Sequence, residues 1–317
     1  MKAAVIDQFG PSSALQVRDI PTPEITVDQI LVEVHAASVN PIDWKIRDGM
    51  MGDRYGKEFP MVLGLDASGV VVKVGDSVTE FKEGDEIYAR SDNGAGKCYA
   101  EYVALNPGTV ALKPESLSHV EAAAIPLAAL TPLIGMRDCA GLKAGDRILI
   151  IGASGGVGIF AVQIAKLMGA DVTAVCSTRN TDLARELGAD RVIDYTQGVV
   201  LQAGDDYDVI YDTVGAQTYE SAKPALKEEG IYLTLVPVPG IDFFIPGQTE
   251  RMTGKGYFVA WTPHASDLRI LADWVASGQL RPVIDSEYPL EEIQQAHERS
   301  RTLRAQGKII IRMDVDG

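Results

Sequence analysis

The spacing of hydrophobic and polar positions changes near residue 120, and this change predicts two kinds of domain. Before that point, short apolar runs rich in β-branched residues are separated by glycine and proline, as in Ile30–Val39 and Ala67–Gly75. Runs of this length and composition predict strands. We therefore expect the first third of the chain to form a small, partly barrel-like β domain.

Beyond residue 120, strand-like and helix-like segments alternate. Residues 147–152 predict a strand, and residues 158–169 have apolar positions close to helical spacing before Gly169 ends the helix. Further strands are predicted at 171–176, 191–195, 207–215 and 230–236, and further helices at 181–188 and 218–230. Repeated strand–helix units predict a parallel sheet, and the right-handed crossover rule makes that sheet doubly wound.

The last part of the chain has a mixed pattern again. Helices are predicted at 267–279 and 290–303, and strands at 281–290 and 307–313. We expect this tail to pack on the N-terminal domain, which makes that domain discontinuous. A cleft between the two domains is then the expected ligand site.

Composition and charge exclude several classes of function. A chain of 317 residues exceeds the size at which one core stops growing, so two domains are expected. A net charge of −15 disfavours nucleic acid and an anionic membrane surface as partners. The apolar run Val120–Met136 is too short to span a bilayer. Three widely spaced cysteines fit a reducing cytosol, and the first residues lack the apolar run of a signal peptide, so we expect a cytoplasmic protein.

The segment Ile148–Gly158 changes from an apolar strand into a glycine-rich turn before a helix. Within it, Ala153–Gly158 has the spacing A-x-G-x-x-G of a dinucleotide-binding turn. Small residues let backbone N–H groups approach a pyrophosphate, and the positive end of the helix dipole lies beneath it. A tight turn that binds nothing is the alternative. The turn residues expected to contact the cofactor are Ser154, Gly155, Gly156, Val157 and Gly158.

The end of the next strand indicates which dinucleotide is bound. An NAD site normally has an acidic residue there, which accepts a hydrogen bond from the ribose 2′-OH. Here the residues after Cys176 are Ser177, Thr178 and Arg179. Hydroxyl groups and a guanidinium suit a 2′-phosphate, so we expect NADPH. The alternative is that Ser177 and Arg179 are only loop and helix-start residues.

Eight motifs, in order along nearly the whole chain, resemble the medium-chain dehydrogenase/reductase superfamily. They are VNPIDWKIRDG, FPMVLGLDASGVVVKVGDSV, FKEGDEIYA, AAAIPLAALTP, GDRILIIGASGGVG, ELGADRVIDY, YDVIYDTVG and GKIII. Within the superfamily the chain is most similar to the quinone oxidoreductase branch. The resemblance implies a GroES-like substrate domain over residues 1–120 and 265–317 and a Rossmann NADPH-binding domain over residues 121–264. It also implies a homodimer joined through the Rossmann domains, and reduction of quinones or α,β-unsaturated carbonyl compounds.

The sequence departs from the zinc-dependent members of this superfamily at the metal ligands. Those enzymes have a cysteine where this chain has Asn40, and Gly-His-Glu where it has Gly64-Leu65-Asp66. They also have a four-cysteine lobe, whereas residues 90–100 here contain only Cys98. The histidines and cysteines show no ligand spacing, so we expect neither catalytic nor structural zinc. Without that Lewis acid, reduction needs hydrogen-bond donors for the developing oxyanion.

Four residues are candidates for this chemistry: Asn40, Asp43, Lys45 and Tyr55. Asn40 stands where the family places a site residue and is a candidate donor, but Asn before Pro also suits a helix N-cap. Lys45 is a candidate donor to the oxyanion or a contact of the cofactor phosphate, with a solvated surface charge as the alternative. Asp43 is expected to orient a neighbour, and Tyr55 to line the substrate cleft.

The resemblance implies further cofactor contacts. Thr131, Val236 and Val259 are expected near the nicotinamide, and the backbone of Gly215 near its ribose. Tyr195 is expected near the adenosine phosphate, with a half-buried tyrosine at a strand end as the alternative. Two other functions remain open, because the cofactor residues are clearer than the catalytic ones. These are a metal-free carbonyl reductase and a non-catalytic NADPH-binding or sensor protein.

Overall fold

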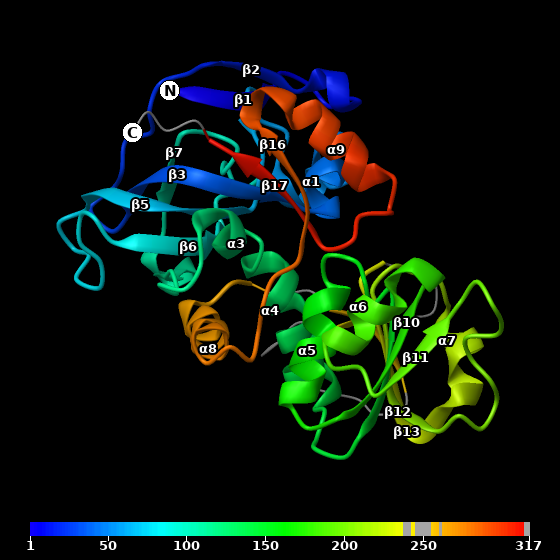
Figure 1. Ribbon diagram of the computed structural model, residues 1–317. Coiled ribbons are helices and arrows are strands. Elements are labelled where there is room, and N and C mark those ends of the chain that lie inside the picture. Colours follow the sequence, from blue (N-terminus) through cyan, green and yellow to red (C-terminus); the bar gives the residue numbers. More distant parts are fainter. Residues whose placement is uncertain (237–241, 245–254, 260–261, 314–317) are drawn as a thin grey trace. The chain divides into compact units, whose positions relative to one another are not determined.

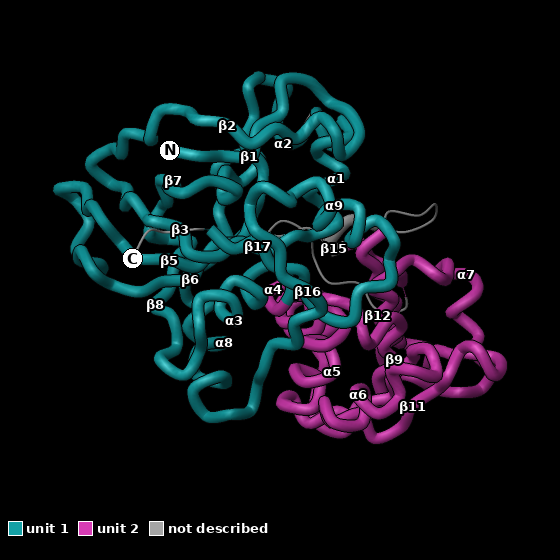
Figure 2. The backbone as a smooth tube through the Cα atoms, turned by 45° about the horizontal axis from the view of Figure 1, so that its top comes forward, with its two compact units in different colours: residues 1–128, 262–317 teal, residues 129–261 magenta. Residues whose placement is uncertain are grey.

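The chain divides into two compact units. The computed structural model describes residues 1–236, 242–244, 255–259 and 262–313, without the side chains of residues 53, 242–244 and 259. Unit 1 contains residues 1–128 and 262–317, and unit 2 contains residues 129–261 (Figure 2). The sequence placed the divisions after residues 120 and 264. The structure divides the chain inside helix α4 (Pro126–Ile134) and just before helix α8 (Ala265–Ala276).

Unit 1 is built on two β-sheets. The larger sheet has the order β16-β17-β3-β5-β6-β8, with β7 also paired to β3, and the smaller has the order β2-β1-β4. The strands are β1 (Lys2–Ile6), β2 (Gln16–Asp19), β3 (Ile30–Val39), β4 (Met61–Val62), β5 (Asp66–Val74), β6 (Glu86–Arg90), β7 (Tyr102–Leu105), β8 (Val110–Leu112), β16 (Ile284–Pro289) and β17 (Lys308–Arg312). The unit also contains the helices α1 (Pro41–Arg47), α2 (Gly52–Tyr55), α3 (His119–Ala123), α8 and α9 (Ile293–Arg301).

Strand β3 joins the N-terminal and C-terminal parts of unit 1. It pairs with β5, β7 and β17, and Figure 1 shows red β17 beside blue β3. Buried and half-buried side chains alternate at its start, where Ile30, Val32 and Val34 enter the core. Its last four residues are all buried. Strand β3 therefore delivers Asn40, the next residue, into the interior.

Unit 2 is a parallel sheet with the order β11-β10-β9-β12-β13-β15-β14. Its strands are β9 (Arg147–Ile151), β10 (Asp171–Cys176), β11 (Arg191–Asp194), β12 (Tyr207–Asp212), β13 (Leu226–Thr234), β14 (Asp242–Phe244) and β15 (Gly256–Val259). Helix α5 (Gly158–Leu167) contacts β9 and β10, and α6 (Thr181–Glu186) contacts β10 and β11. The strand order reverses between β9 and β12, as in a doubly wound sheet. The predicted fold class is therefore confirmed.

One predicted helix extends too far at its C-terminal end. The pattern predicted a helix at 218–230. Helix α7 covers Tyr219–Ala222, a 3₁₀ turn continues over Lys223–Ala225, and β13 begins at Leu226. Pro224 has no N–H for the α-helical ladder, and it lies in the 3₁₀ turn that replaces the α-helix there. In the described part of the chain, no helix is long and apolar enough to cross a bilayer.

Candidate cofactor and active site

The glycine turn between β9 and α5 has an open side. A Cβ at Gly158 would lie 2.1 Å from the carbonyl oxygen of Gly152, so the turn requires glycine there. At Gly155 the nearest atom to an added Cβ would be 3.4 Å away. Within the described chain, the N–H groups of Gly156 and Val157 donate to no other group. The turn thus offers unused backbone donors in front of a helix start, which is the chemistry a pyrophosphate requires.

The residues after β10 form a cluster of hydroxyl groups around one buried amide. Asn180 is 5% exposed, and its Nδ2 donates to Ser154 Oγ at 2.7 Å and to Ser177 Oγ at 3.3 Å. Thr178 Oγ1 instead donates to the carboxylate of Asp194 at 2.6 Å. Because its only proton is donated there, Thr178 is a poorer phosphate donor than the two serines.

An acidic residue does lie at this edge of the sheet, but on the neighbouring strand. Asp194 ends β11 and stands in register with Cys176, the last residue of β10. Hydrogen bonds from the hydroxyls of Thr178 and Thr196 lower the pKa of Asp194. The next residue, Tyr195, is 53% exposed, and its N–H donates to the carbonyl of Cys176 at 3.1 Å. The structure therefore brings Tyr195 next to the residues that follow β10.

Several predicted cofactor residues meet at the carboxyl ends of β9, β12 and β13. Gly215 has a φ of +73°, and a Cβ there would lie 2.8 Å from the Cβ of Val236. A Cβ at Gly152 would lie 2.7 Å from Cγ1 of Val214, so the loops after these strands are in contact. The side chain of Val259 lies outside the described residues, although its backbone ends β15. Thr131 is buried in α4.

Asp212 fixes the loop that carries Gly215. It is fully buried, and it accepts hydrogen bonds from the N–H groups of Val214, Gly215 and Gln217 at 3.0, 2.8 and 2.7 Å. The hydroxyl of Tyr232 also donates to it, at 3.1 Å. Our sequence reasoning missed Asp212 as a functional residue. Its position just before Thr-Val-Gly at a strand end was the available signal.

In unit 1, Asn40 belongs to a buried network of charged and polar groups. Its Nδ2 donates to Asp66 Oδ2 at 2.9 Å, and its Oδ1 accepts from the ammonium of Lys308 at 2.6 Å. Asp43 Oδ2 accepts from the backbone N–H of Asn40 at 2.7 Å and from the hydroxyl of Tyr99 at 2.8 Å. Asn40 is 2% exposed. It is the N-cap residue of α1, and its side chain hydrogen-bonds to both Asp66 and Lys308. Lys308 and Tyr99 were not among the candidates expected from the sequence.

Burial dominates the ionisation of this network. Desolvation raises the pKa of Asp43 from 3.8 to about 7, while its hydrogen bonds and the charge of Lys308 oppose that rise. Burial also raises the pKa of Asp66 and lowers that of Lys308. Asp43 Oδ1 is buried and accepts no hydrogen bond from the described residues. The network is therefore sensitive to proton uptake and to loss of its one ammonium.

Lys45 has a different environment from the network. Its ammonium lies 5.6 Å from the centre of the Trp44 ring, and Arg301 lies 5.5 Å from the same ring. Partial burial lowers the pKa of Lys45. Among the residues that the structure describes, it forms no ion pair and no side-chain hydrogen bond. A half-buried ammonium without a counterion can bind an anion, which argues against a purely solvated surface charge.

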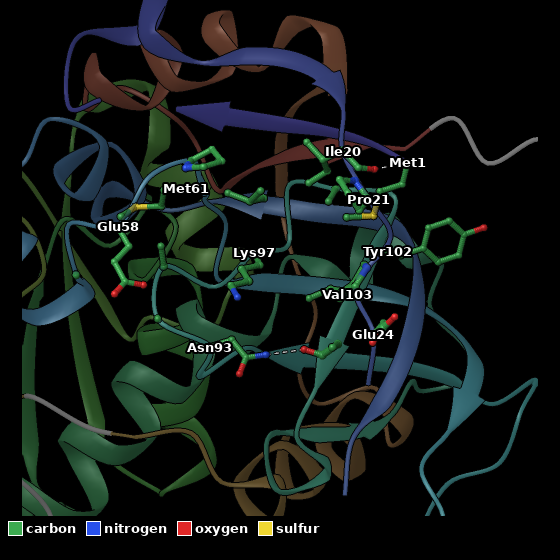
Figure 3. A pocket seen from close by; sticks show the side chains of 18 of the residues that line it. Met1, Ile20, Pro21, Glu24, Glu58, Met61, Asn93, Lys97, Tyr102 and Val103 are labelled. Atoms are coloured by element: carbon green, nitrogen blue, oxygen red, sulfur yellow. Dashed lines mark hydrogen bonds between the residues drawn. The ribbon is translucent and has the colours of Figure 1, made fainter. Parts of the chain in front are cut away.

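Tyr55 lies apart from the other three candidates. It helps to line a pocket of about 780 Å³ on unit 1. Figure 3 shows Met61 on one side of this pocket, Tyr102 on the other, and Lys97 between them. Asn40, Asp43 and Lys45 are not among the described residues that line it. The structure thus brings together Asn40 and Asp43, with Lys45 on the same helix, but does not add Tyr55.

The two units have the architecture of a GroES-like domain, here with a buried polar network, and of a Rossmann-type domain with a glycine-rich turn. Comparisons with known proteins agree. The alcohol dehydrogenase GroES-like domain model matches residues 26–115, and the zinc-binding dehydrogenase model matches residues 187–311.

Two curated relatives and one solved structure are similar to nearly the whole chain. It is 36% identical to the mitochondrial NAD(P)H oxidoreductase RTN4IP1 of Mus musculus, over 98% of this chain and 89% of that protein. It is 35% identical to the chloroplastic NADPH-dependent alkenal/one oxidoreductase of Arabidopsis thaliana, over 98% and 79%. The structure of the quinone oxidoreductase from Coxiella burnetii has a TM-score of 0.85 and 32% identity, over 98% and 99%. The chain belongs to the quinone oxidoreductase branch of the medium-chain dehydrogenase/reductase superfamily.

Proposed function

We propose that this protein is an NADPH-dependent reductase of quinones or α,β-unsaturated carbonyl compounds. The single observation that carries the proposal is the open glycine turn, whose Gly156 and Val157 N–H groups donate to no described residue. Relatives named for NADPH, alkenals or enones, and quinones supply the substrate class. Turn residues 154–158 would hold the pyrophosphate, and Ser177 with Arg179 the 2′-phosphate.

The chain's own task is to stabilise the charge that reduction creates. Bound NADPH supplies a hydride to the electron-poor carbon of the acceptor. Negative charge then develops on the acceptor's oxygen, and a nearby donor must bind that oxygen. Lys45 is the donor we favour, because its half-buried ammonium forms no ion pair in the described chain. Asn40 and Asp43 position the start of α1, which carries Lys45.

We propose that the reaction is independent of zinc, although one matching family model is named for zinc binding. Zinc-dependent relatives have cysteine, histidine and glutamate where this chain has Asn40, Leu65 and Asp66. Here Leu65 is apolar, and Asn40 donates a hydrogen bond to Asp66. Lys308 supplies a positive charge 2.6 Å from the Asn40 oxygen. An amide and an ammonium are not the deprotonated ligands that Zn²⁺ selects.

An NADPH-oxidation assay tests the function. Purified protein with NADPH and a panel of quinones and enones should show acceptor-dependent loss of absorbance at the NADPH band. The metal-free carbonyl reductase predicts activity with simple ketones instead. NADPH binding without any acceptor-dependent oxidation would leave the sensor function and reject the enzyme. Zinc at one equivalent per chain, with activity lost on chelation, would reject zinc independence.

We further propose a homodimer joined through unit 2 and a cytoplasmic location. Homodimerisation follows from the family resemblance, and light scattering of the purified protein measures it directly. A monomeric mass at micromolar concentration would contradict it. The cytoplasmic location rests on the cysteine pattern and differs from that of the relatives named as mitochondrial and chloroplastic. Fractionation of cells that express the full chain tests the location.

A further inference from the structure

We propose that Asn180 is a positioning residue that directs the hydroxyl protons of Ser154 and Ser177 toward the phosphates of the cofactor. This inference rests on the proposed NADPH function. Asn180 lies between two loops that leave the same edge of the sheet. Ser154 belongs to the turn after β9, and Ser177 follows β10, the parallel neighbour of β9.

The direction of the hydrogen bonds carries the argument. Asn180 Nδ2 has two protons, and it donates to both serine oxygens. A serine hydroxyl has one proton and two lone pairs, so a serine that accepts from Asn180 keeps its proton to donate. In the described chain, neither Ser154 nor Ser177 donates its hydroxyl proton to another group. Both hydroxyls are therefore held as donors without a partner.

The neighbouring threonine shows the opposite arrangement. Thr178 Oγ1 gives its proton to Asp194 and is left only with lone pairs. Lone pairs repel a phosphate, whereas O–H groups attract it. Within this cluster, Ser154 and Ser177 accept from the Asn180 amide and can donate, whereas Thr178 donates to the Asp194 carboxylate and can only accept. The hydroxyl groups that can donate to a phosphate are therefore those of Ser154 and Ser177.

The remaining polar atom of the Asn180 side chain has no partner in the described part of the chain. Its Oδ1 is buried and accepts no hydrogen bond from the described residues. A buried carbonyl oxygen without a donor destabilises the folded state. Asn180 is nevertheless only 5% exposed. Its two donated bonds to phosphate-facing serines are then the reason we infer for its presence.

Cofactor binding by single and combined variants tests the inference. We expect Asn180→Ala to raise the NADPH dissociation constant about tenfold, the effect of losing roughly one charge-assisted hydrogen bond. The NADH dissociation constant should rise less. NADH has the pyrophosphate that we assign to Ser154, but it lacks the 2′-phosphate that we assign to Ser177. At saturating NADPH, kcat should stay unchanged. Asn180→Asp should weaken binding further, because a carboxylate takes the serine protons for itself.

The decisive comparison uses a background without the serine hydroxyls. In Ser154→Ala/Ser177→Ala protein, adding Asn180→Ala should change NADPH affinity by less than about twofold, because Asn180 acts through those hydroxyls. Asn106→Ala, the same chemical change in unit 1, is the control and should bind NADPH normally. Melting curves show whether each variant is folded.

Three outcomes are informative. An undiminished tenfold effect of Asn180→Ala in the double-serine background would overturn the positioning role. Unchanged affinity of the single variant, in folded protein, would overturn it too. Failure of the unmodified protein to bind NADPH would instead reject the proposed function, which keeps the two failures distinct.

Discussion

Replacing Lys308 by methionine should destabilise unit 1 strongly and in a pH-dependent manner. The side chain is 3% exposed, and its ammonium contacts Asn40 Oδ1 at 2.6 Å and the carbonyl oxygen of Val39 at 3.3 Å. Asp43 and Asp66 are both fully buried nearby, and the charge of Lys308 lowers both pKa values. Removing one partner from a buried set of charges costs about 3–5 kcal/mol, and we expect that loss at pH 8.

The sign of the pH dependence follows from the carboxyl groups. The folded state raises the pKa of Asp43 from 3.8 to about 7, so the folded protein binds this proton more tightly than the unfolded chain. The free-energy cost of burying the ionised Asp43 carboxylate is absent below about pH 4 and complete above the folded pKa. The free energy of unfolding therefore falls as the pH rises from about 4 to above the folded pKa. Loss of Lys308 raises both carboxyl pKa values further. At pH 5, below the folded pKa of Asp43, this carboxyl group is protonated, and the deficit should fall to about half or less.

Urea unfolding at pH 5 and pH 8, followed by tryptophan fluorescence, measures the deficit, because Trp44 and Trp274 both belong to unit 1. Asp43→Asn is the matched companion, because Asp43 Oδ1 accepts no hydrogen bond from the described residues and an amide NH₂ there breaks none. The double variant Lys308→Met/Asp43→Asn should recover about 2 kcal/mol at pH 8. A deficit below about 1 kcal/mol at pH 8, or an equal deficit at both pH values, would refute this reasoning.

Four further variants test the glycine turn, the oxyanion donor and the 2′-phosphate contact. Gly158→Ala places a Cβ 2.1 Å from the Gly152 oxygen, so it should lower the melting temperature and cost about 1–3 kcal/mol. Gly155→Ala meets nothing closer than 3.4 Å, so it should fold normally but raise the NADPH dissociation constant in a fluorescence titration. Lys45→Met should reduce kcat with quinones by about 10²–10³-fold while NADPH affinity stays within about threefold, and an unchanged kcat would exclude Lys45 as the oxyanion donor. Arg179→Ala should raise KM for NADPH by about 10- to 100-fold without changing KM for NADH, and an equal rise for both cofactors would contradict the 2′-phosphate contact.

Much of the fold was predictable because its signals are local. The alternation of strands and helices after residue 120 and the spacing of Gly155 and Gly158 are properties of short segments. The predicted helix at 218–230 was too long, because residues 226–230 belong to β13 and the pattern was given more weight than Pro224. Strands β14 and β15 were not predicted at all, because a strand of three or four residues has too little pattern to distinguish it from a loop.

The candidate site was less predictable because its chemistry depends on residues that are distant in sequence. Asn40 was expected as a donor or as a cap, and the structure gives it the cap position together with two ionic partners. The importance of Lys308 had no local signal, since an isolated lysine before an apolar strand is normally a surface residue. Asn180 likewise had no signal, because its partner Ser154 is 26 residues away.

The sequence by itself determined the family, the sheet type and the position of the glycine-rich turn. These features follow from local periodicity and from glycine, whose lack of a Cβ permits a tight turn whatever surrounds it. Only the tertiary structure decided which polar groups are buried together. Pairing of β17 with β3 brings Lys308 to Asn40 across 268 residues, and it places two carboxyl groups where water cannot solvate them. Ionisation depends on that solvation and on nearby charge, so the properties of Asp43, Asp66 and Lys308 arise only in the folded chain.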